Sequence, residues 1–128
     1  MKKLIFILFV ALFGYKQMFA GKIKNLYAQK KSDVQVMDKG VVVKILSDDN
    51  IGSRHQKFIL KLDSGITVMI THNIDLAKRI NSLSIGDEVE FYGEYEYNSK
   101  GGVVHWTHHD PKKYHKNGWL KHNGVTYQ

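Results

Sequence analysis

The stretch HQKFILKLDSGITVMITH, residues 55–72, carries two runs of alternating apolar and polar residues on either side of a turn. Such alternation indicates β-strands with one buried face, and a three-residue loop ending in glycine is typical of a β-hairpin. We expect Leu62 to pair with Ile66 across the loop, with Gly65 in the left-handed conformation. A two-residue loop would oppose apolar residues to threonines, so burial favours the three-residue loop. The further pairs in this register are Leu60 with Val68, Phe58 with Ile70, and Gln56 with His72.

Similar β-like runs before and after this hairpin extend the pattern to a whole domain. The five expected strands are 41–46, 55–62, 66–72, 88–97 and 102–108. Between the third and fourth strands, apolar residues recur at helical spacing over 74–83, and Asn73 can serve as the N-cap of a short helix. Three strands, a short helix and two strands is the element order of a five-stranded OB-type barrel. We therefore predict an all-β, OB-like barrel with one short helix.

The N-terminus is typical of a signal peptide. Met1–Lys3 is positively charged, and Leu4–Gly14 is an unbroken apolar run whose length suits a signal peptide better than a mature membrane span. We expect cleavage after Ala20, which predicts an exported protein, either periplasmic or secreted. Met18 is larger than the residue usually found at that distance from a cleavage site, so an uncleaved membrane anchor stays an alternative.

The rest of the chain is expected to form one domain. Residues 21–38 are rich in lysine and show no sustained period, so we expect a flexible lead before a domain over 39–128 that ends in a polar tail. Removal of residues 1–20 takes away three lysines and lowers the formal net charge from +7 to +4. The absence of cysteine excludes disulfides, a lipoprotein anchor and thiolate metal ligands.

The expected fourth strand alternates as clearly as the hairpin. Val89, Phe91, Gly93, Tyr95 and Tyr97 would face the core, and a row of glutamates would face outward: Glu88, Glu90, Glu94 and Glu96. We interpret this row as a charged edge that discourages aggregation between strands, with a binding site as the alternative.

All seven histidines lie outside the signal segment, and the barrel topology gathers several of them. In an OB barrel the third and fifth strands are parallel neighbours and the second is antiparallel to the third, so the ends of all three meet at one rim. The candidate metal ligands expected there are His72, His105, His108, His109 and Asp110. The candidate ligand-binding residues are Arg54, His55, Gln56, Asn73 and Trp106. His115 and His122 are interpreted as surface or hydrogen-bonding residues of the tail and not as ligands.

Histidine is the commonest side-chain ligand of borderline divalent metals, so this rim predicts a protein that binds a small ligand or a transition metal such as zinc, copper or nickel. No set of nucleophile, base and orienting group is recognisable, which favours binding over catalysis. The alternative is a metal-dependent hydrolase, for example a nuclease. There His105, His108 or His109 would hold an ion with Asp110, and Arg54 would hold a phosphate. The metal, the ligand and the oligomeric state stay open.

Two interaction roles are weaker alternatives. OB barrels often bind single-stranded nucleic acid on the second and third strands, where the outward residues are Lys57, Ile59, Lys61, Thr67, Met69 and Thr71. These residues include no aromatic ring on which a base could stack, and the glutamates of 88–97 add repulsion, so the composition disfavours nucleic acid. The other role is an interaction module in which the tail around Trp119 docks a protein partner.

The sequence also resembles a family of small exported bacterial proteins catalogued as a domain of unknown function, number 3465. The resemblance covers about residues 36–128, and its most specific motif is the string from His105 to Pro111. Tyr97 stands where the family pattern favours a tryptophan. The resemblance implies export and a single domain, and it implies no activity. The other matching segments are 48–49, 52–56, 72–77, 86–87, 93–95, 98–102, 118–119 and 124–128.

Overall fold

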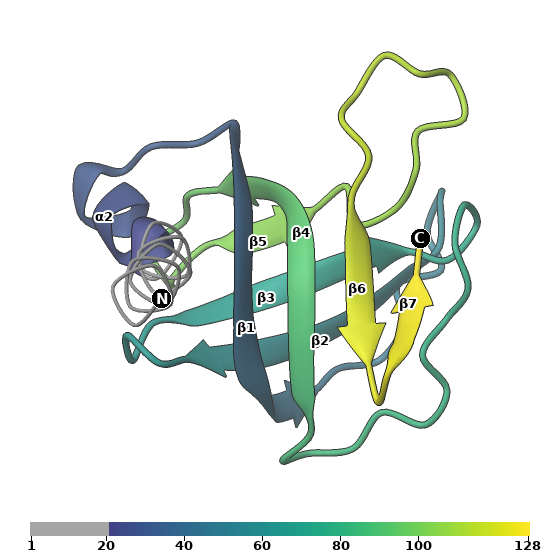
Figure 1. Cartoon of the computed structure of the whole chain (residues 1–128), viewed down its shortest axis with the longest axis horizontal. Helices are drawn as coiled ribbons and strands as arrows, with labels where there is room; N and C mark the ends of the chain where they lie inside the picture. Colours follow the sequence, from purple (N-terminus) through teal and green to yellow (C-terminus); the bar gives the residue numbers. More distant parts are fainter. Residues whose placement is uncertain (1–20) are drawn as a thin grey trace, which may run out of the picture.

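The computed structural model describes residues 21–128. Their secondary structure is mostly β and forms a closed barrel (Figure 1). The elements are α2 (Lys22–Gln29), β1 (Val34–Ile45), β2 (His55–Leu62), β3 (Thr67–Asn73), β4 (Glu88–Glu96), β5 (Val103–His105), β6 (Trp119–His122) and β7 (Val125–Tyr127). The sheet order is β1-β2-β3-β5-β4, and β4 pairs again with β1, which closes five strands into an OB-like barrel. β6 pairs with β4 and β7 pairs with β6, so a hairpin extends the sheet. The predicted fold class is confirmed.

The hairpin of β2 and β3 has the register expected from its alternating sequence. Phe58 lies opposite Ile70, and the Leu62 backbone N–H donates to the Ile66 carbonyl at 2.9 Å. Gly65 has φ 89°, a left-handed conformation that a side chain would strain. The three-residue loop is therefore confirmed.

The barrel interior is filled by the inward residues of these alternating strands. On β4 every second residue from Val89 is buried, and the Tyr95 hydroxyl at the end of this row donates to the Gly101 carbonyl at 2.7 Å. Burial raises the pKa of Tyr95 to about 12, so the phenol stays neutral inside the core. The other buried apolar residues include Val36, Val42, Phe58, Leu60, Ile70, Phe91, Val104 and Leu120.

The expectation of a flexible lead over 21–38 is wrong, because this segment forms α2 and the first part of β1. Ile23 and Leu26, three residues apart on one helix face, are both buried in the core. The Tyr27 ring lies 5.6 Å from that of Tyr97 and fixes the helix against the end of the barrel. Two buried apolar residues in eight are too few to show a period in the sequence. No helix in residues 21–128 has the length and apolar character needed to cross a bilayer.

The helix expected over 74–83 is also wrong, since this segment consists of turns and irregular backbone. A single turn does form at Asn73, whose carbonyl accepts from the Ala77 N–H at 3.1 Å. The buried Gln56 side chain then takes both backbone groups of Ile80, donating to its carbonyl at 2.8 Å and accepting from its N–H at 2.9 Å. A side chain of β2 thus replaces the hydrogen bonds that a helix would have made.

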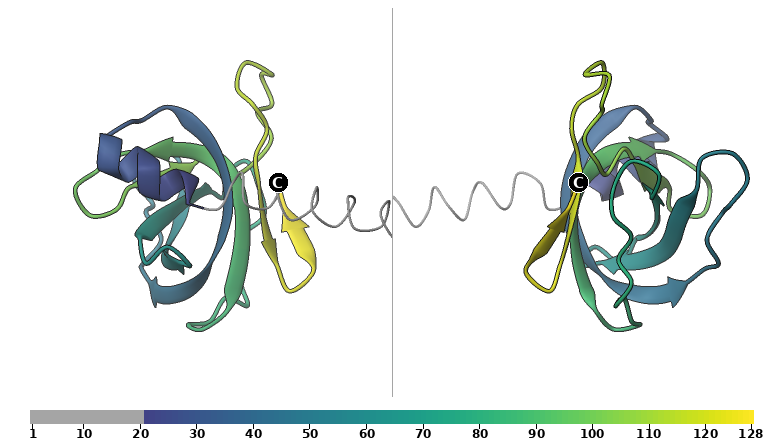
Figure 2. Two further views of the ribbon diagram at one scale, coloured as in Figure 1. Left: turned by 60° about the vertical axis from the view of Figure 1, so that its left-hand side comes forward. Right: turned by 90° about the vertical axis from the view of Figure 1, so that its right-hand side faces the viewer.

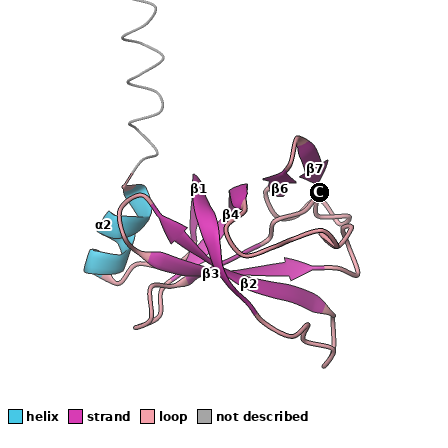
Figure 3. Cartoon of the chain, turned by 90° about the horizontal axis from the view of Figure 1, so that it is seen from below, coloured by secondary structure: helices cyan, strands magenta, loops and turns pink. Residues whose placement is uncertain are grey.

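β4 is a central strand, so the interpretation of its glutamates as an edge device is wrong. It pairs with β1 along one side and with β5 and β6 along the other. The segment expected to be a polar tail supplies β6 and β7, which lie on the far side of the barrel from α2 (Figure 3). The expected fifth strand ends early at His105, and the loop that follows reaches beyond the end of β6 (Figure 2).

Candidate metal and ligand site

The outer face of β4 and β5 carries the most concentrated group of candidate ligands in the described chain. Glu94 lies directly opposite His105 in the antiparallel β4–β5 pair, and Glu96 follows two residues later on the same face. The two strands approach closely at Gly93, where a Cβ would lie 2.5 Å from the His105 carbonyl oxygen. β5 ends at His105 because Trp106 takes a left-handed conformation with φ 57°.

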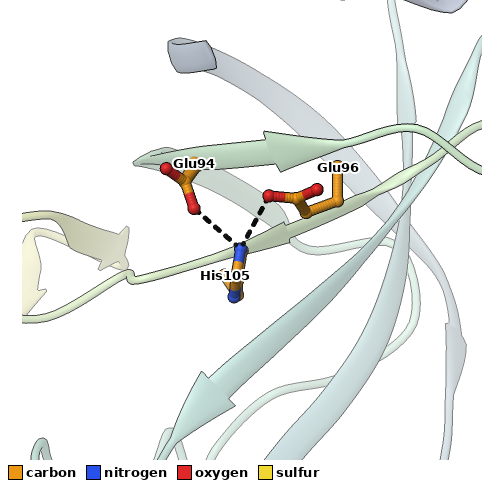
Figure 4. Close-up of side chains that lie close together, drawn as sticks. All are labelled: Glu94, Glu96 and His105. Carbon is orange, nitrogen blue, oxygen red and sulfur yellow. Dashed lines mark ion pairs between the residues drawn. The ribbon is translucent and has the colours of Figure 1, made fainter. Parts of the chain in front are cut away.

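Glu94, Glu96 and His105, named here the carboxylate–histidine site, converge on one point (Figure 4). His105 Nε2 lies 3.1 Å from Glu94 Oε2 and 3.4 Å from Glu96 Oε1, and one ligand atom from each residue lies within 4.8 Å of the others. Ligand atoms that share one divalent ion at 2.0–2.2 Å are separated by roughly 3.0–3.5 Å. The spacing around His105 Nε2 therefore already suits a bound ion.

Hydrogen bonding around this site is incomplete. His105 Nε2 is buried and makes no hydrogen bond of acceptable geometry, despite its short distances to both carboxylates. Gln35 lies opposite Glu94 on β1, and its Nε2 is likewise buried without a partner. Within residues 21–128 these are the two buried side-chain atoms that lack a hydrogen bond, and they flank the same carboxylate. Buried polar atoms are rarely left without a partner in a complete site.

The surroundings of the site disfavour two charged carboxylates that have no cation between them. Burial raises the pKa of Glu96 above its ordinary value, a hydrogen bond and charge interaction with Asp33 add to this shift, and His105 opposes it. The side chain of Glu94 is only 20% exposed. A divalent cation would neutralise both groups, so the cluster fits a cation better than it fits an anion.

His115 and Trp106 support Glu94 from the long loop. His115 Nε2 lies 3.1 Å from Glu94 Oε1, its Nδ1 lies 2.8 Å from the Lys116 carbonyl, and its ring stacks on Trp106 at 4.1 Å. Both ring nitrogens face acceptor oxygens, an arrangement that the imidazolium form satisfies. His115 is thus a partly buried, hydrogen-bonding residue of the long loop.

A pocket of about 230 Å³ opens beside His105 at the rim of the barrel, as the sequence predicted for this end of β2, β3 and β5. We name it the rim pocket. It contains three of the rim histidines, an aromatic wall and several small polar side chains. Its lining residues are Ser53, His55, Thr71, Asn73, Leu76, His105, Trp106 and His108.

His55 and His108 are held in one defined orientation by backbone carbonyls. His55 Nδ1 lies 2.8 Å from the Ser53 carbonyl, and His108 Nδ1 lies 2.7 Å from the His109 carbonyl. A carbonyl oxygen only accepts, so Nδ1 carries the proton in both rings and the neutral ring keeps its lone pair on Nε2. Burial lowers the pKa of His108, and the nearby charge of His55 contributes to that shift.

His72, by contrast, has no free nitrogen. Its Nε2 donates to the Lys78 carbonyl at 3.0 Å, which leaves Nδ1 to accept from the Thr107 hydroxyl at 2.7 Å. The side chain is fully buried, and this burial lowers its pKa from 6.5 to about 4. The expectation that His72 ligates a metal is wrong because a structural role uses both ring nitrogens.

Three other candidates also have structural partners. The Asp110 carboxylate accepts from the backbone N–H groups of Lys112, Tyr114 and His115, and these hydrogen bonds lower its pKa. Arg54 Nε pairs with Asp75 Oδ1 at 2.7 Å, and Gln56 holds the irregular segment after β3 as described above. His109 is exposed and contributes its backbone carbonyl to His108. Asp110 thus lies beside His108 and His115, but neither Asp110 nor Arg54 lines the rim pocket.

His122 is the second histidine of the tail, and it is a buried, hydrogen-bonding residue. It is 2% exposed, and its Nε2 lies 2.8 Å from Asp87 Oδ2, which lowers the pKa of Asp87. The pair joins β6 to the segment before β4 at a distance from the rim pocket. It stabilises the C-terminal hairpin against the barrel.

Glu94 and Glu96 were not among the candidate ligands chosen from the sequence, although the topology contained the information. An OB barrel places the fourth strand beside the fifth, so outward glutamates two residues apart on one had to lie near an outward histidine on the other. The alternative of a binding site for the glutamate row pointed in this direction.

The fold and the site define a small OB-like barrel with a polar, histidine-rich outer face. The chain belongs to the family described as "Protein of unknown function (DUF3465)", whose model matches residues 7–128, and the suspected membership is thereby confirmed. No curated protein matches the chain.

Proposed function

We propose that this is an exported binding protein that holds a divalent transition metal at the carboxylate–histidine site. One observation carries the proposal: the buried His105 Nε2 faces two carboxylates at 3.1 and 3.4 Å without a well-aligned hydrogen bond to either. An ion at this point would satisfy the nitrogen and neutralise Glu94 and Glu96 at the same time.

The donor set supports a borderline ion, with zinc as the first candidate and copper and nickel as the others. One imidazole and two carboxylates suit these ions, and the chain has no thiolate to offer. Three protein ligands leave at least one coordination position for water or a small ligand. His115 would act as the outer partner of Glu94.

Support for the hydrolase alternative is weaker. Its phosphate-binding Arg54 is paired with Asp75, and its carboxylate Asp110 accepts three backbone hydrogen bonds. Neither group is directed at the ion that we propose. A binding role therefore remains the better supported one.

Export is the second part of the proposal and rests on Met1–Lys3 followed by Leu4–Gly14, which lie outside the described residues. The N-terminal residue of the protein recovered from its host tests it. We expect Gly21, which follows the proposed cleavage after Ala20. A mature chain that still begins at Met1 would leave only the anchored form.

Thermal melting of the purified protein with and without zinc, copper or nickel tests the metal site. Each ion that binds the folded state should raise the melting temperature by mass action. His105→Gln and the double variant Glu94→Gln/Glu96→Gln should lose most of the response to zinc. The matched controls are His109→Gln, an exposed histidine nearby, and Glu90→Gln, an exposed glutamate of β4. Equal responses in all these variants would refute the site.

A further inference from the structure

We propose that the rim pocket is a second metal site, separate from the carboxylate–histidine site, in which His55 and His108 bind a nitrogen-preferring divalent ion such as Cu²⁺ or Ni²⁺. The two sites use different ligands, so either could exist without the other. The inference therefore goes beyond the proposed function and does not depend on it.

The orientation of the two rings is the first argument. Each gives its Nδ1–H to a backbone carbonyl, at 2.8 Å for His55 and 2.7 Å for His108. Metal-binding histidines almost always donate their second ring nitrogen to a carbonyl, a carboxylate or water, which fixes the tautomer and aims the lone pair. The remaining Nε2 of each ring makes no hydrogen bond within the described chain, and both residues line the same pocket.

The contrast with His72 strengthens this argument. That ring lies close enough for the charges of His55 and His108 to affect it, yet both of its nitrogens have protein partners. The fold therefore saturates one histidine of this group and leaves a lone pair on each of the other two. Imidazole nitrogens are good ligands for copper and nickel.

The volume of the pocket is the second argument. About 230 Å³ is far more than a bare ion needs and leaves room for several waters beside it. An ion with two protein ligands must complete its coordination with water or with a small ligand, and this requires such space. The hydroxyl of Ser53 and the amide of Asn73 line the pocket and can hold those waters.

Copper titration followed by electron paramagnetic resonance tests the inference. In a His105→Gln background, which removes the only nitrogen ligand of the first site, one equivalent of Cu²⁺ should couple to two nitrogens. Adding His55→Gln or His108→Gln should remove one coupling and weaken copper binding by on the order of tenfold or more. Adding His109→Gln should change neither.

Coupling to fewer than two nitrogens in the background would overturn the second site, as would two-nitrogen coupling that persists in both added variants. His55 is only partly buried, so His55→Gln keeps the test valid if the buried His108 cannot be replaced without unfolding. If the carboxylate–histidine site does not exist, wild type and His105→Gln should bind the same number of ions. The number of ions bound therefore distinguishes failure of the first site from failure of the second.

Discussion

Histidines on the inner and outer faces of β3, β4 and β5 have opposite surroundings. His72 points inward from β3, is fully buried and has a protein partner at each ring nitrogen. His105 points outward from β5, and its buried Nε2 meets two carboxylates without a hydrogen bond. Burial alone would have selected the wrong histidine as the ligand. The unsatisfied nitrogen, and not the depth of the ring, separates a candidate site from a structural role.

The largest expected effect comes from the inner face. Phe58→Ala removes a ring with no exposed surface from the centre of the barrel and should lower the free energy of unfolding by about 3–5 kcal/mol. Lys57→Ala, one residue away on the outer face, should change it by about 0.5 kcal/mol or less. Denaturant unfolding of both variants measures the difference. A larger loss for Lys57→Ala would mean that the two faces are assigned the wrong way round.

The second effect is a pH dependence that originates at His72. Its pKa is lowered from 6.5 to about 4, so between these values the unfolded chain binds a proton that the folded protein does not. Stability should therefore be complete above pH 6.5 and fall by about 3 kcal/mol as the pH drops to 4. Denaturant unfolding over this range measures the slope.

The variant His72→Gln sharpens this test. Glutamine does not titrate, so the slope between pH 6.5 and 4 should become shallower, even though stability at neutral pH falls by about 1–2 kcal/mol with the lost hydrogen bonds. The stability linked to the lowered pKa values of Asp87 and Asp110 is lost mainly below about pH 4, and the lowered pKa of His108 leaves a residual slope of the same sign in this variant. An unchanged slope in His72→Gln would assign the pH dependence to other groups.

Metal binding provides the third test of the comparison. At a free zinc concentration one hundred times the Kd of the carboxylate–histidine site, zinc should stabilise the wild type by about 2.7 kcal/mol. His72→Gln should keep this increment, and His105→Gln should lose it. The increment should weaken as the pH is lowered, because a protonated imidazole cannot ligate. Paired melting curves at pH 7.5 and 5.5 measure it, and loss of the increment in His72→Gln would contradict the assignment.

The inner face could be predicted from the sequence because its information is local. The alternation of Phe58, Leu60, Val68 and Ile70 and the single glycine of the loop specify the hairpin and its register. Burial requires this register, since a slip of one residue would expose every apolar side chain. The OB order of strands then follows from the spacing of the runs.

Several of the errors share a cause, which is competition from a partner elsewhere in the chain. Gln56 captures both backbone groups of Ile80 and prevents the expected helix, and Asp87 draws His122 out of a supposedly polar tail. Thr107 and Lys78 occupy His72 in the same way. No local pattern shows which polar group will find a partner thirty residues away. The position of the polar rim could therefore be predicted from the sequence. Which of its side chains keep a ligand atom without a protein partner could not.

The smallest expected effect concerns the outer face without metal. Glu96→Gln removes a carboxylate whose pKa is raised by burial and by Asp33, so its charge is not a source of stability in the metal-free protein. The free energy of unfolding should stay within about 0.5 kcal/mol of wild type or rise slightly. In saturating zinc the same variant should be clearly less stable than wild type, because one ligand is missing. Denaturant unfolding with zinc and with a chelator gives both numbers. A clear destabilisation in chelator would show that Glu96 supports the fold through His105, and would return the outer-face cluster to a structural role.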